Sequence, residues 1–171
     1  MLYVSRFSNP ELKSGKYTPV RISLGAPKWP LGYTIAGEIK ELMPFGLLQI
    51  NDQALYEKRY RDRLNRIGHD RIQEVLDSFG VDKPVVLLCY EDIRDPSQWC
   101  HRTMFAQWWL ELTGEIADEL PDPSEVKLKH PQRAAKAAAA KAAMPSHKAA
   151  MEKAQERMRQ READEMQMRM F

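Results

Sequence analysis

A short, continuous apolar run in the middle of the chain constrains the fold more than any other feature. Residues 85–89 read Val-Val-Leu-Leu-Cys, with Pro84 before them and a polar segment soon after them. The short length favours a strand over a helix, and the lack of polar residues is typical of a strand covered on both faces. We therefore predict that residues 84–90 form the central strand of a parallel sheet.

Two other segments have strand character, and helical patterns separate and follow them. Residues 2–7 open the chain with apolar side chains, and residues 19–24 alternate apolar and polar residues. Apolar residues recur at helical spacing over 55–67, 70–79 and 104–112, and a glycine follows each of these segments within two residues. Strands that alternate with helices predict an α/β fold: a three-layer domain with a small, mostly parallel sheet and covering helices.

Residues 25–50 contain three prolines and four glycines, which interrupt regular structure. An irregular segment of this length inside a compact domain is typical of a binding loop. We expect this segment to be mostly irregular and to contribute to a ligand site.

The distribution of charge changes near residue 120. Residues 1–123 carry 15 Lys and Arg against 18 Asp and Glu, whereas residues 124–171 carry 11 against 6. The seam reads Leu-Pro-Asp-Pro at 120–123, where the prolines disfavour helix. We divide the chain into an α/β domain at 1–120 and a basic tail, rich in Ala, Lys and Met, at 121–171.

The tail is predicted to be a helical extension. Ten of the seventeen residues at 134–150 are alanine, the best helix former, and Pro145 should end this helix. Ser146 caps a second predicted helix that runs to about Met168 with a thin apolar face. Three roles stay open for the tail: electrostatic contact with nucleic acid, a solvated tail, or self-association and binding of a protein partner.

Composition indicates where the chain resides. It contains no apolar run long enough for a membrane span and no secretion-signal pattern at its start. Its two cysteines are too few for a disulfide framework and are expected to be reduced. We therefore expect a soluble, cytoplasmic protein without a membrane partner.

The residues that follow the predicted central strand are the first candidates for a site, because parallel sheets bind ligands beyond the carboxyl ends of their strands. Cys89 ends the strand, Glu91 follows it, and Trp-Cys-His-Arg at 99–102 opens the next helix. Amide groups at a helix start attract anions, and Arg102 adds a planar fork of donors suited to phosphate. The same field favours the thiolate form of Cys100. We predict that these residues converge on one pocket.

Within this pocket we assign catalytic roles to Cys100, His101 and Glu91, and ligand binding to Arg102 and Cys89. Each residue also has a purely structural reading. Cys89 and Cys100 are each alternatively small core residues. His101 is alternatively a helix cap or a buried hydrogen-bonded side chain. Arg102 alternatively pairs with Glu91 alone.

Several other kinds of site are disfavoured. Cys89, Cys100 and His101 offer three metal ligands, but structural zinc sites normally show four, with closely paired spacing. The sequence lacks a P-loop, a Gly-x-Gly-x-x-Gly motif and a nucleophile-elbow serine. We therefore predict no metal and no other cofactor.

Taken together, the motifs resemble a known family. Val-Val-Leu-Leu-Cys-Tyr-Glu at 85–91, followed by Trp-Cys-His-Arg at 99–102, resembles the signature of the domain-of-unknown-function 488 (DUF488) family. Residues 3–7 and 19–29 resemble two earlier segments of that family, and the helix containing Tyr56 and Tyr60 is similar to another. The longer loop before Cys100 and the basic tail depart from the family pattern.

The resemblance covers about residues 1–115 and implies a compact three-layer α/β domain with the Cys-His-Arg triplet at a helix start. It implies no reaction, because the family is named for lacking one. From the shared segments we add five ligand-binding candidates: Tyr3, Ser5, Ser23, Lys28 and Trp29.

Three functions follow as hypotheses. The leading one is a pocket domain that binds a phosphate-bearing ligand, either a nucleotide or nucleic acid, with hydrolase or transferase chemistry left open. The alternative is a non-enzymatic adaptor whose C-terminal helices bind a protein partner, self-associate or contact nucleic acid without sequence preference. A third is a thiol-transfer protein that uses Cys89 and Cys100.

Overall fold

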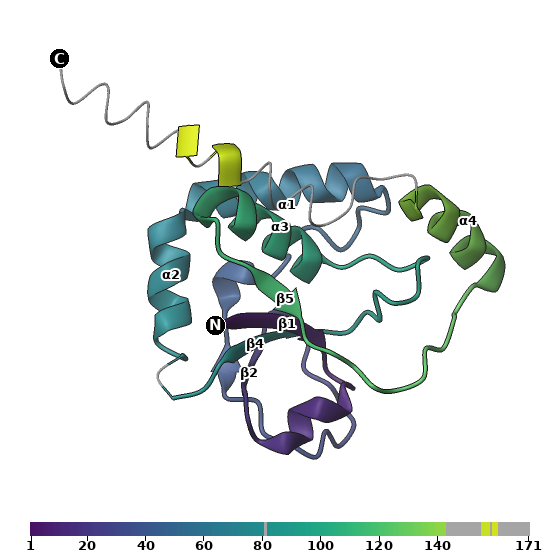
Figure 1. The fold of residues 1–171 in the computed structure, drawn as a ribbon, viewed down its shortest axis with the longest axis horizontal. Helices are drawn as coiled ribbons and strands as arrows, with labels where there is room; N and C mark the ends of the chain where they lie inside the picture. The colour runs from purple at the N-terminus through teal and green to yellow at the C-terminus, as the bar shows by residue number, and fades with distance from the viewer. Residues whose placement is uncertain (81, 143–154, 158, 161–171) are drawn as a thin grey trace.

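A five-stranded sheet forms the centre of the molecule (Figure 1), in a computed structural model that describes residues 1–80, 82–142, 155–157 and 159–160. The strands are β1 (Leu2–Arg6), β2 (Thr18–Arg21), β3 (Gly37–Glu38), β4 (Val85–Cys89) and β5 (Ala117–Glu119). The α-helices are α1 (Gln53–Ile67), α2 (His69–Asp77), α3 (His101–Thr113) and α4 (Pro131–Ala142). Two short 3-10 helices, η1 (Pro10–Ser14) and η2 (Lys40–Leu42), are also present, and residues 155–157 and 159–160 are helical.

The sheet has the strand order β3-β2-β4-β1-β5, and every neighbouring pair is parallel. The predicted central strand, β4, is the middle strand, and all five of its residues are buried. A strand between two parallel neighbours and two covered faces has no position where a polar side chain reaches water, which explains its apolar sequence. The predicted α/β fold is confirmed.

The two faces of the sheet are covered in different ways. Val85 and Leu87 of β4 pack into a core with side chains of α1, α2 and α3, which lie together on one side of the sheet (Figure 1). Val86 and Leu88 point the other way, into a smaller core with Phe7, Leu12 of η1 and Tyr33 of the loop before β3. The third layer is therefore a 3-10 helix and a loop instead of α-helices.

The predicted C-terminal ends of α1 and α3 match their capping glycines, whereas α2 runs from His69 to Asp77 and ends at Ser78, two residues before the predicted glycine. In α1 the carboxylate of Asp52 accepts a hydrogen bond from the amide of Leu55 at 2.7 Å. Gly68 follows its last turn with a φ of 86°, and Gly114 follows α3 with a φ of 74°. Both angles are unfavourable for residues with a Cβ atom, so glycine at these positions defines where each helix ends.

The two edge strands were not predicted. β3 has two residues and β5 has three, and neither shows an apolar alternation that a sequence pattern would reveal. Apart from β3 and η2, residues 25–50 are irregular as expected. Gly37 of β3 lies against the ring of Phe79, which would be 2.7 Å from a Cβ atom at this position, so this edge requires a glycine.

The seam after β5 stays in contact with the body of the protein. Asp122 and Ser124 bind the side chains of Arg6 and Arg94, and the amide of Lys129 donates to Asp95. The predicted alanine-rich helix is present as α4, and the prediction that Pro145 ends it lies outside the described residues. Most of the second predicted tail helix lies outside the described residues. Within the described part of the chain, none of the helices combines the length and apolar character that a bilayer crossing requires.

Candidate functional site

A pocket of about 440 Å³ lies at the carboxyl ends of β2 and β4, as predicted for a parallel sheet. Its polar lining includes Cys89, Glu91, Cys100 and His101, which come from the end of β4 and the start of α3. A larger cavity of about 740 Å³ is lined by residues that include Met1, Gln73 and Trp109, but by no cysteine or histidine. The chemistry-bearing side chains therefore gather at one end of the sheet.

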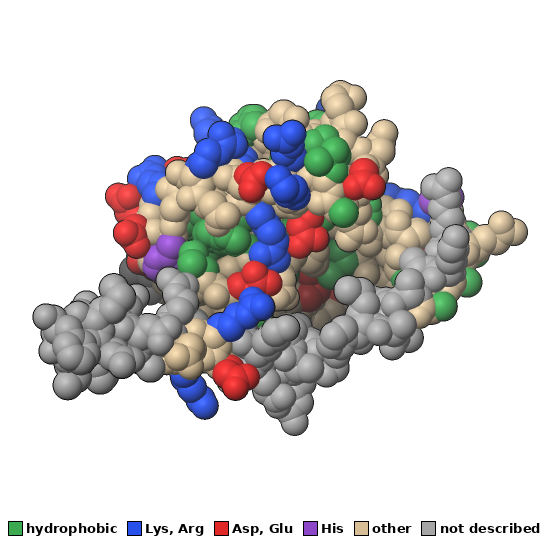
Figure 2. All heavy atoms as spheres, turned by 90° about the horizontal axis from the view of Figure 1, so that it is seen from above, with side chains coloured by type: hydrophobic (Ala, Val, Ile, Leu, Met, Phe, Trp, Pro, Cys, Tyr) green, Lys and Arg blue, Asp and Glu red, His purple; other side chains and the backbone are tan. Residues whose placement is uncertain are grey.

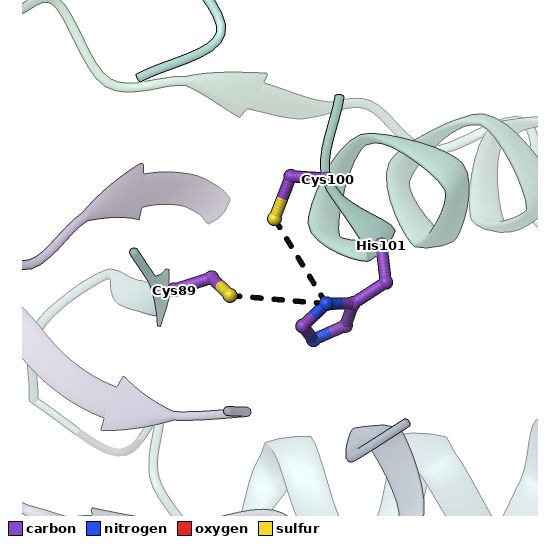
Figure 3. Close-up of side chains that lie close together, drawn as sticks. All are labelled: Cys89, Cys100 and His101. Atoms are coloured by element: carbon purple, nitrogen blue, oxygen red, sulfur yellow. Dashed lines mark hydrogen bonds between the residues drawn. The ribbon is translucent and has the colours of Figure 1, made fainter. Parts of the chain in front are cut away.

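Two cysteines and one histidine form a compact cluster in this pocket. The sulfur atoms of Cys89 and Cys100 lie 3.7 Å and 3.9 Å from Nδ1 of His101, and both point toward that nitrogen (Figure 3). All three ligand-type atoms lie within 4.8 Å of one another. The three residues are 2–5% exposed, so the cluster is shielded from bulk water except through the pocket.

The orientation of the His101 ring is held from its other side. Its Nε2 atom lies 3.0 Å from the carbonyl oxygen of Ile22, at the end of β2. A carbonyl oxygen can only accept a hydrogen bond, so Nε2 carries a hydrogen and Nδ1 is the atom that faces the thiols. The ring of Tyr60 packs edge-on against the imidazole at 5.5 Å, and its hydroxyl donates to the carbonyl of Leu42.

The thiols and the imidazole share their protons unevenly. Burial by itself raises the pKa of Cys100, but hydrogen bonds with Cys89 and His101 and the positive charges of His101 and Arg102 bring this pKa well below its ordinary value. The hydrogen bond with Cys100 and burial raise the pKa of Cys89. Burial lowers the pKa of His101, yet the hydrogen bond and charge of Cys100 leave it raised overall. These opposite shifts favour thiolate character on Cys100 over Cys89.

Glu91 adds a carboxyl group beside the cluster. The thiol of Cys89 donates to its Oε2 atom at 3.1 Å. Burial and the charge of Cys100 raise the pKa of Glu91. Among the described residues its carboxylate has no salt-bridge partner, which makes it available for proton transfer inside the pocket.

Arg102 does not line the pocket. Its Nε and one terminal nitrogen donate to both carboxylate oxygens of Glu119 at 3.1 Å and 2.9 Å. The other terminal nitrogen donates to the backbone carbonyl of Glu91 at 2.7 Å, and the side chain is 1% exposed. The guanidinium therefore ties β5 and the start of the β4–α3 loop to α3. Its positive charge lowers the pKa of Cys100, while its three nitrogen atoms donate to Glu119 and to the carbonyl of Glu91.

Tyr3 and Ser5 lie on the opposite face of the sheet from the cluster. In the register of β1 with β4 they pair with Val86 and Leu88, whose side chains point away from Cys89. Ser5 accepts a hydrogen bond from the side-chain amide of Asn9 in that buried layer. Neither residue lines the pocket.

The remaining candidates lie on or near the rim. Ser23 lines the pocket, and its hydroxyl donates to the carbonyl of Gly25 at 2.8 Å. Trp29 is about half exposed and packs edge-on against Tyr90, a lining residue, with ring centroids 5.9 Å apart. Lys28 is exposed and outside the lining.

The structure adds lining residues that the sequence analysis did not single out for binding. They are mainly apolar or amide-bearing and come from the irregular loop, α1 and the β4–α3 loop: Leu24, Pro44, Leu48, Ile50, Asn51, Tyr56, Ser97, Gln98 and Trp99. Tyr56 packs edge-on against Trp99, with centroids 4.8 Å apart. The glycine- and proline-rich composition of residues 25–50 was the signal that pointed to the loop, although it could not name the residues.

Charged residues on the face seen in Figure 2 are mixed. Lys and Arg side chains are interspersed with Asp and Glu there. Among the described residues several charged side chains are paired, such as Arg61 with Glu111 and Arg71 with Glu41. This face therefore does not carry the one-signed surface that binds a nucleic-acid backbone.

The fold and the site together define a small α/β domain with a parallel sheet and a buried Cys-Cys-His cluster at its carboxyl edge. No family model, curated protein or solved structure matches the chain. The resemblance to the DUF488 family therefore stays a prediction from the motifs.

Proposed function

We propose that this chain is an enzyme of hydrolase or transferase type that binds a small phosphate-bearing ligand at the carboxyl edge of its sheet. One observation carries the proposal: Cys89, Glu91, Cys100 and His101 meet in a single pocket although they come from two separate elements. Nucleophilic, acidic and basic groups in contact with one another and with a cavity are typical of a catalytic centre.

The dimensions of the pocket favour a small ligand with an apolar or aromatic portion. Its volume of about 440 Å³ falls within the range of small-molecule sites. Tyr56, Tyr90 and Trp99 contribute aromatic surface, and Leu48 on the rim is 65% exposed.

The start of α3 is the element that suits a phosphate group. Cys100 is its N-cap residue and makes no side-chain capping hydrogen bond. The first amides of a helix lack intrahelical partners and carry partial positive charge, and those of α3 begin at the pocket. In this proposal these amides take the role that the sequence assigned to Arg102, whose donors bind Glu119 and Glu91.

We assign the proposed catalytic roles from where the residues lie in the pocket. Glu91 transfers a proton to or from the reacting group, and the Cys100–His101 pair activates the attacking group. A phosphate ester hydrolysed in this way exchanges its leaving-group oxygen for the oxygen of water. A transferase would substitute another hydroxyl acceptor.

Two chromogenic probes test the proposal with the full chain: p-nitrophenyl phosphate and p-nitrophenyl acetate. We expect hydrolysis of the phosphate ester above the buffer rate, and a loss of about 100-fold or more in Glu91→Gln and Cys100→Ala. Glu125→Gln is the matched control, because Glu125 is exposed and outside the pocket. Hydrolysis of neither probe, or an unchanged rate in Glu91→Gln, contradicts the proposal. Faster hydrolysis of the acetate would replace phosphate by an acyl ester as the ligand class.

The adaptor hypothesis depends on the helices of the tail, of which the structure describes α4 and residues 155–157 and 159–160. A truncation that tests it should stop after His130, because Asp122, Ser124 and Lys129 are bound to the body. Loss of self-association in the truncated chain, with pocket chemistry retained, would support the adaptor.

A further inference from the structure

The cluster of Cys89, Cys100 and His101 has the spacing of a metal site. Zinc binds thiolate sulfur at about 2.3 Å and imidazole nitrogen at about 2.0 Å, so ligand atoms of a tetrahedral site lie roughly 3.5–3.8 Å apart. The observed distances from Nδ1 to the two sulfur atoms are 3.7 Å and 3.9 Å, and all three atoms lie within 4.8 Å of one another, so the two sulfur atoms would move closer together on binding a metal. Small rotations of the side chains would bring all three atoms to a common centre.

The surroundings of His101 supply a second, independent observation. Histidines that bind metals commonly donate their other ring hydrogen to a carboxylate or a backbone carbonyl, which fixes the tautomer and the ring plane. Nε2 of His101 makes such a bond to the carbonyl of Ile22 at 3.0 Å. The edge-on ring of Tyr60 restrains the imidazole further. With Nε2 bound to this carbonyl, Nδ1 is the ring nitrogen that faces the two sulfur atoms and can bind a metal (Figure 3).

The chemistry of the donor set selects the metal. Two thiolates and one imidazole favour a borderline-soft ion, and their close spacing suits tetrahedral coordination, which is the combination preferred by Zn²⁺. Both cysteines lie in the lining of the pocket, as does His101, so a metal held by them faces a cavity instead of closed protein. Zinc sites with three protein ligands and an open position are catalytic, whereas structural sites use four.

We propose that Sγ of Cys89, Sγ of Cys100 and Nδ1 of His101 bind one Zn²⁺ ion whose fourth position opens into the pocket. Binding releases to solvent any protons that these three ligand atoms hold in the metal-free chain. Glu91 is outside the group of atoms that lie within 4.8 Å of one another, and it flanks the site through its contact with Cys89.

The position of Glu91 gives the ion a catalytic role, and this part of the inference rests on the proposed function. A water molecule at the open position forms the new bond from its oxygen to phosphorus while the bond from phosphorus to the leaving-group oxygen breaks. The proton of that water passes to Glu91 and then to the leaving group. The metal binding itself does not depend on the identity of the substrate.

Spectroscopic titration tests the site without reference to activity. The full chain, reduced and freed of metal by a chelator, is titrated with Co²⁺ and then with Zn²⁺. We expect one equivalent of Co²⁺ to produce thiolate-to-cobalt charge-transfer absorption in the near ultraviolet and the strong visible bands of four-coordinate cobalt, and Zn²⁺ to abolish both. Absence of these bands with excess Co²⁺ overturns the proposal.

Variants test the ligand set. Cys89→Ala, Cys100→Ala and His101→Gln should each weaken Zn²⁺ binding by about 100-fold or more, since losses of 10–100-fold already follow removal of outer-shell partners. His69→Gln is the matched control, because His69 lies at the start of α2 outside the pocket lining and should leave binding unchanged. Unaltered cobalt spectra in Cys100→Ala overturn the assignment.

Protection from alkylation keeps the test decisive where a variant fails to fold. In the wild-type chain, Zn²⁺ should slow the reaction of both cysteines with iodoacetamide, as read by mass spectrometry, and unprotected cysteines contradict the site.

A disulfide between Cys89 and Cys100 in a chain that binds no metal once reduced would replace the metal with redox chemistry. Bound zinc without hydrolysis of p-nitrophenyl phosphate leaves the metal site standing and removes the proposed function. Hydrolysis that persists after the metal is removed leaves the proposed function standing and removes the catalytic role of the metal.

Discussion

Two polar clusters lie at the carboxyl edge of the sheet, and they differ in how completely their charges are matched. The first is the pocket cluster of Cys89, Glu91, Cys100 and His101. The second, which we call the ion-pair cluster, consists of Arg6, Asp92, Arg94, Asp122 and Ser124. The pocket cluster comes from the end of β4 and the start of α3, whereas the ion-pair cluster comes from the end of β1, the β4–α3 loop and the segment after β5. Both bring charged groups out of bulk water.

The ion-pair cluster is closed on itself. Arg6 pairs with Asp92 at 2.9 Å and with Asp122 at 2.7 Å, and Arg94 binds Asp92 at 2.8 Å. The hydroxyl of Ser124 accepts from Arg6 and donates to Asp122. Two guanidinium groups and two carboxylates thus satisfy one another, and the pKa values of both aspartates are lowered, with hydrogen bonds from Arg94 and Ser124 among the causes.

The pocket cluster has acidic groups without matching cations. Two thiols and a carboxyl group face a single histidine, and the guanidinium nearest to them donates to Glu119 and to a backbone carbonyl. Charged groups that stabilise a fold are normally paired, whereas charged groups in functional sites often lack a partner and reduce stability. The contrast indicates that the ion-pair cluster serves the fold and the pocket cluster serves function.

The largest effect that tests this contrast is expected at Arg102, which lies between the two clusters. Arg102→Met leaves the carboxylate of Glu119 and the carbonyl of Glu91 without their donors. Removing one partner of a buried ion pair costs about 3–5 kcal/mol, and we expect about 3 kcal/mol because Glu119 retains one-third exposure. Urea unfolding measures the change.

The surface pair of Arg61 with Glu111 provides the control for Arg102. Arg61→Met should cost less than about 1 kcal/mol, since solvent screens this pair. A near-native stability of Arg102→Met, combined with loss of phosphate binding in calorimetry, would instead assign Arg102 to ligand binding.

A smaller loss is expected within the ion-pair cluster. Asp122→Asn removes the negative charge that Arg6 and Arg94 share, and we expect a decrease of roughly 1.5–3 kcal/mol in the free energy of unfolding at neutral pH. The pKa of Asp122 is lower in the folded protein than the unfolded value of about 3.9. Its contribution is therefore present above that pH and is lost as the pH falls through the folded pKa.

The pH dependence of this variant offers its own check. The difference in stability between wild type and Asp122→Asn should be constant from neutral pH to about pH 5 and should shrink below about pH 4. A difference that grows on acidification would show that the carboxylate is not stabilised by its arginine partners.

The sequence predicted the framework of the molecule because the framework depends on local signals. The buried run at 85–89 is the central strand, and Gly68 and Gly114 end the helices they follow. The edge strands β3 and β5 escaped prediction because strands of two or three residues are specified by their neighbours in the sheet.

The candidate site was predicted in part for the same reason. Cys89 and Cys100 flank one loop, so the rule that places ligands at carboxyl ends of strands brought them together. The face on which Tyr3 and Ser5 lie depends on the register of β1 against β4, which a sequence pattern does not fix. The partner of Arg102 is Glu119 on β5, a strand that was not predicted, so the burial of the guanidinium could not be foreseen.

The smallest expected change concerns Glu91, and it tests the contrast most directly. Glu91→Gln is the same chemical change as Asp122→Asn: each replaces a carboxylate by an amide of equal shape. In the ion-pair cluster this change removes the partner of two arginines. In the pocket cluster it removes a charge that has no salt-bridge partner among the described residues, and the amide oxygen can still accept the hydrogen bond from the thiol of Cys89.

We expect the stability of Glu91→Gln, measured by urea unfolding with a chelator present, to stay within about 0.5 kcal/mol of wild type or to rise, as is usual for substitutions away from matched networks. A loss as large as that of Asp122→Asn would show that Glu91 belongs to the matched, structural kind of cluster, and the distinction between the two regions would then have to rest on the cysteines and His101 alone.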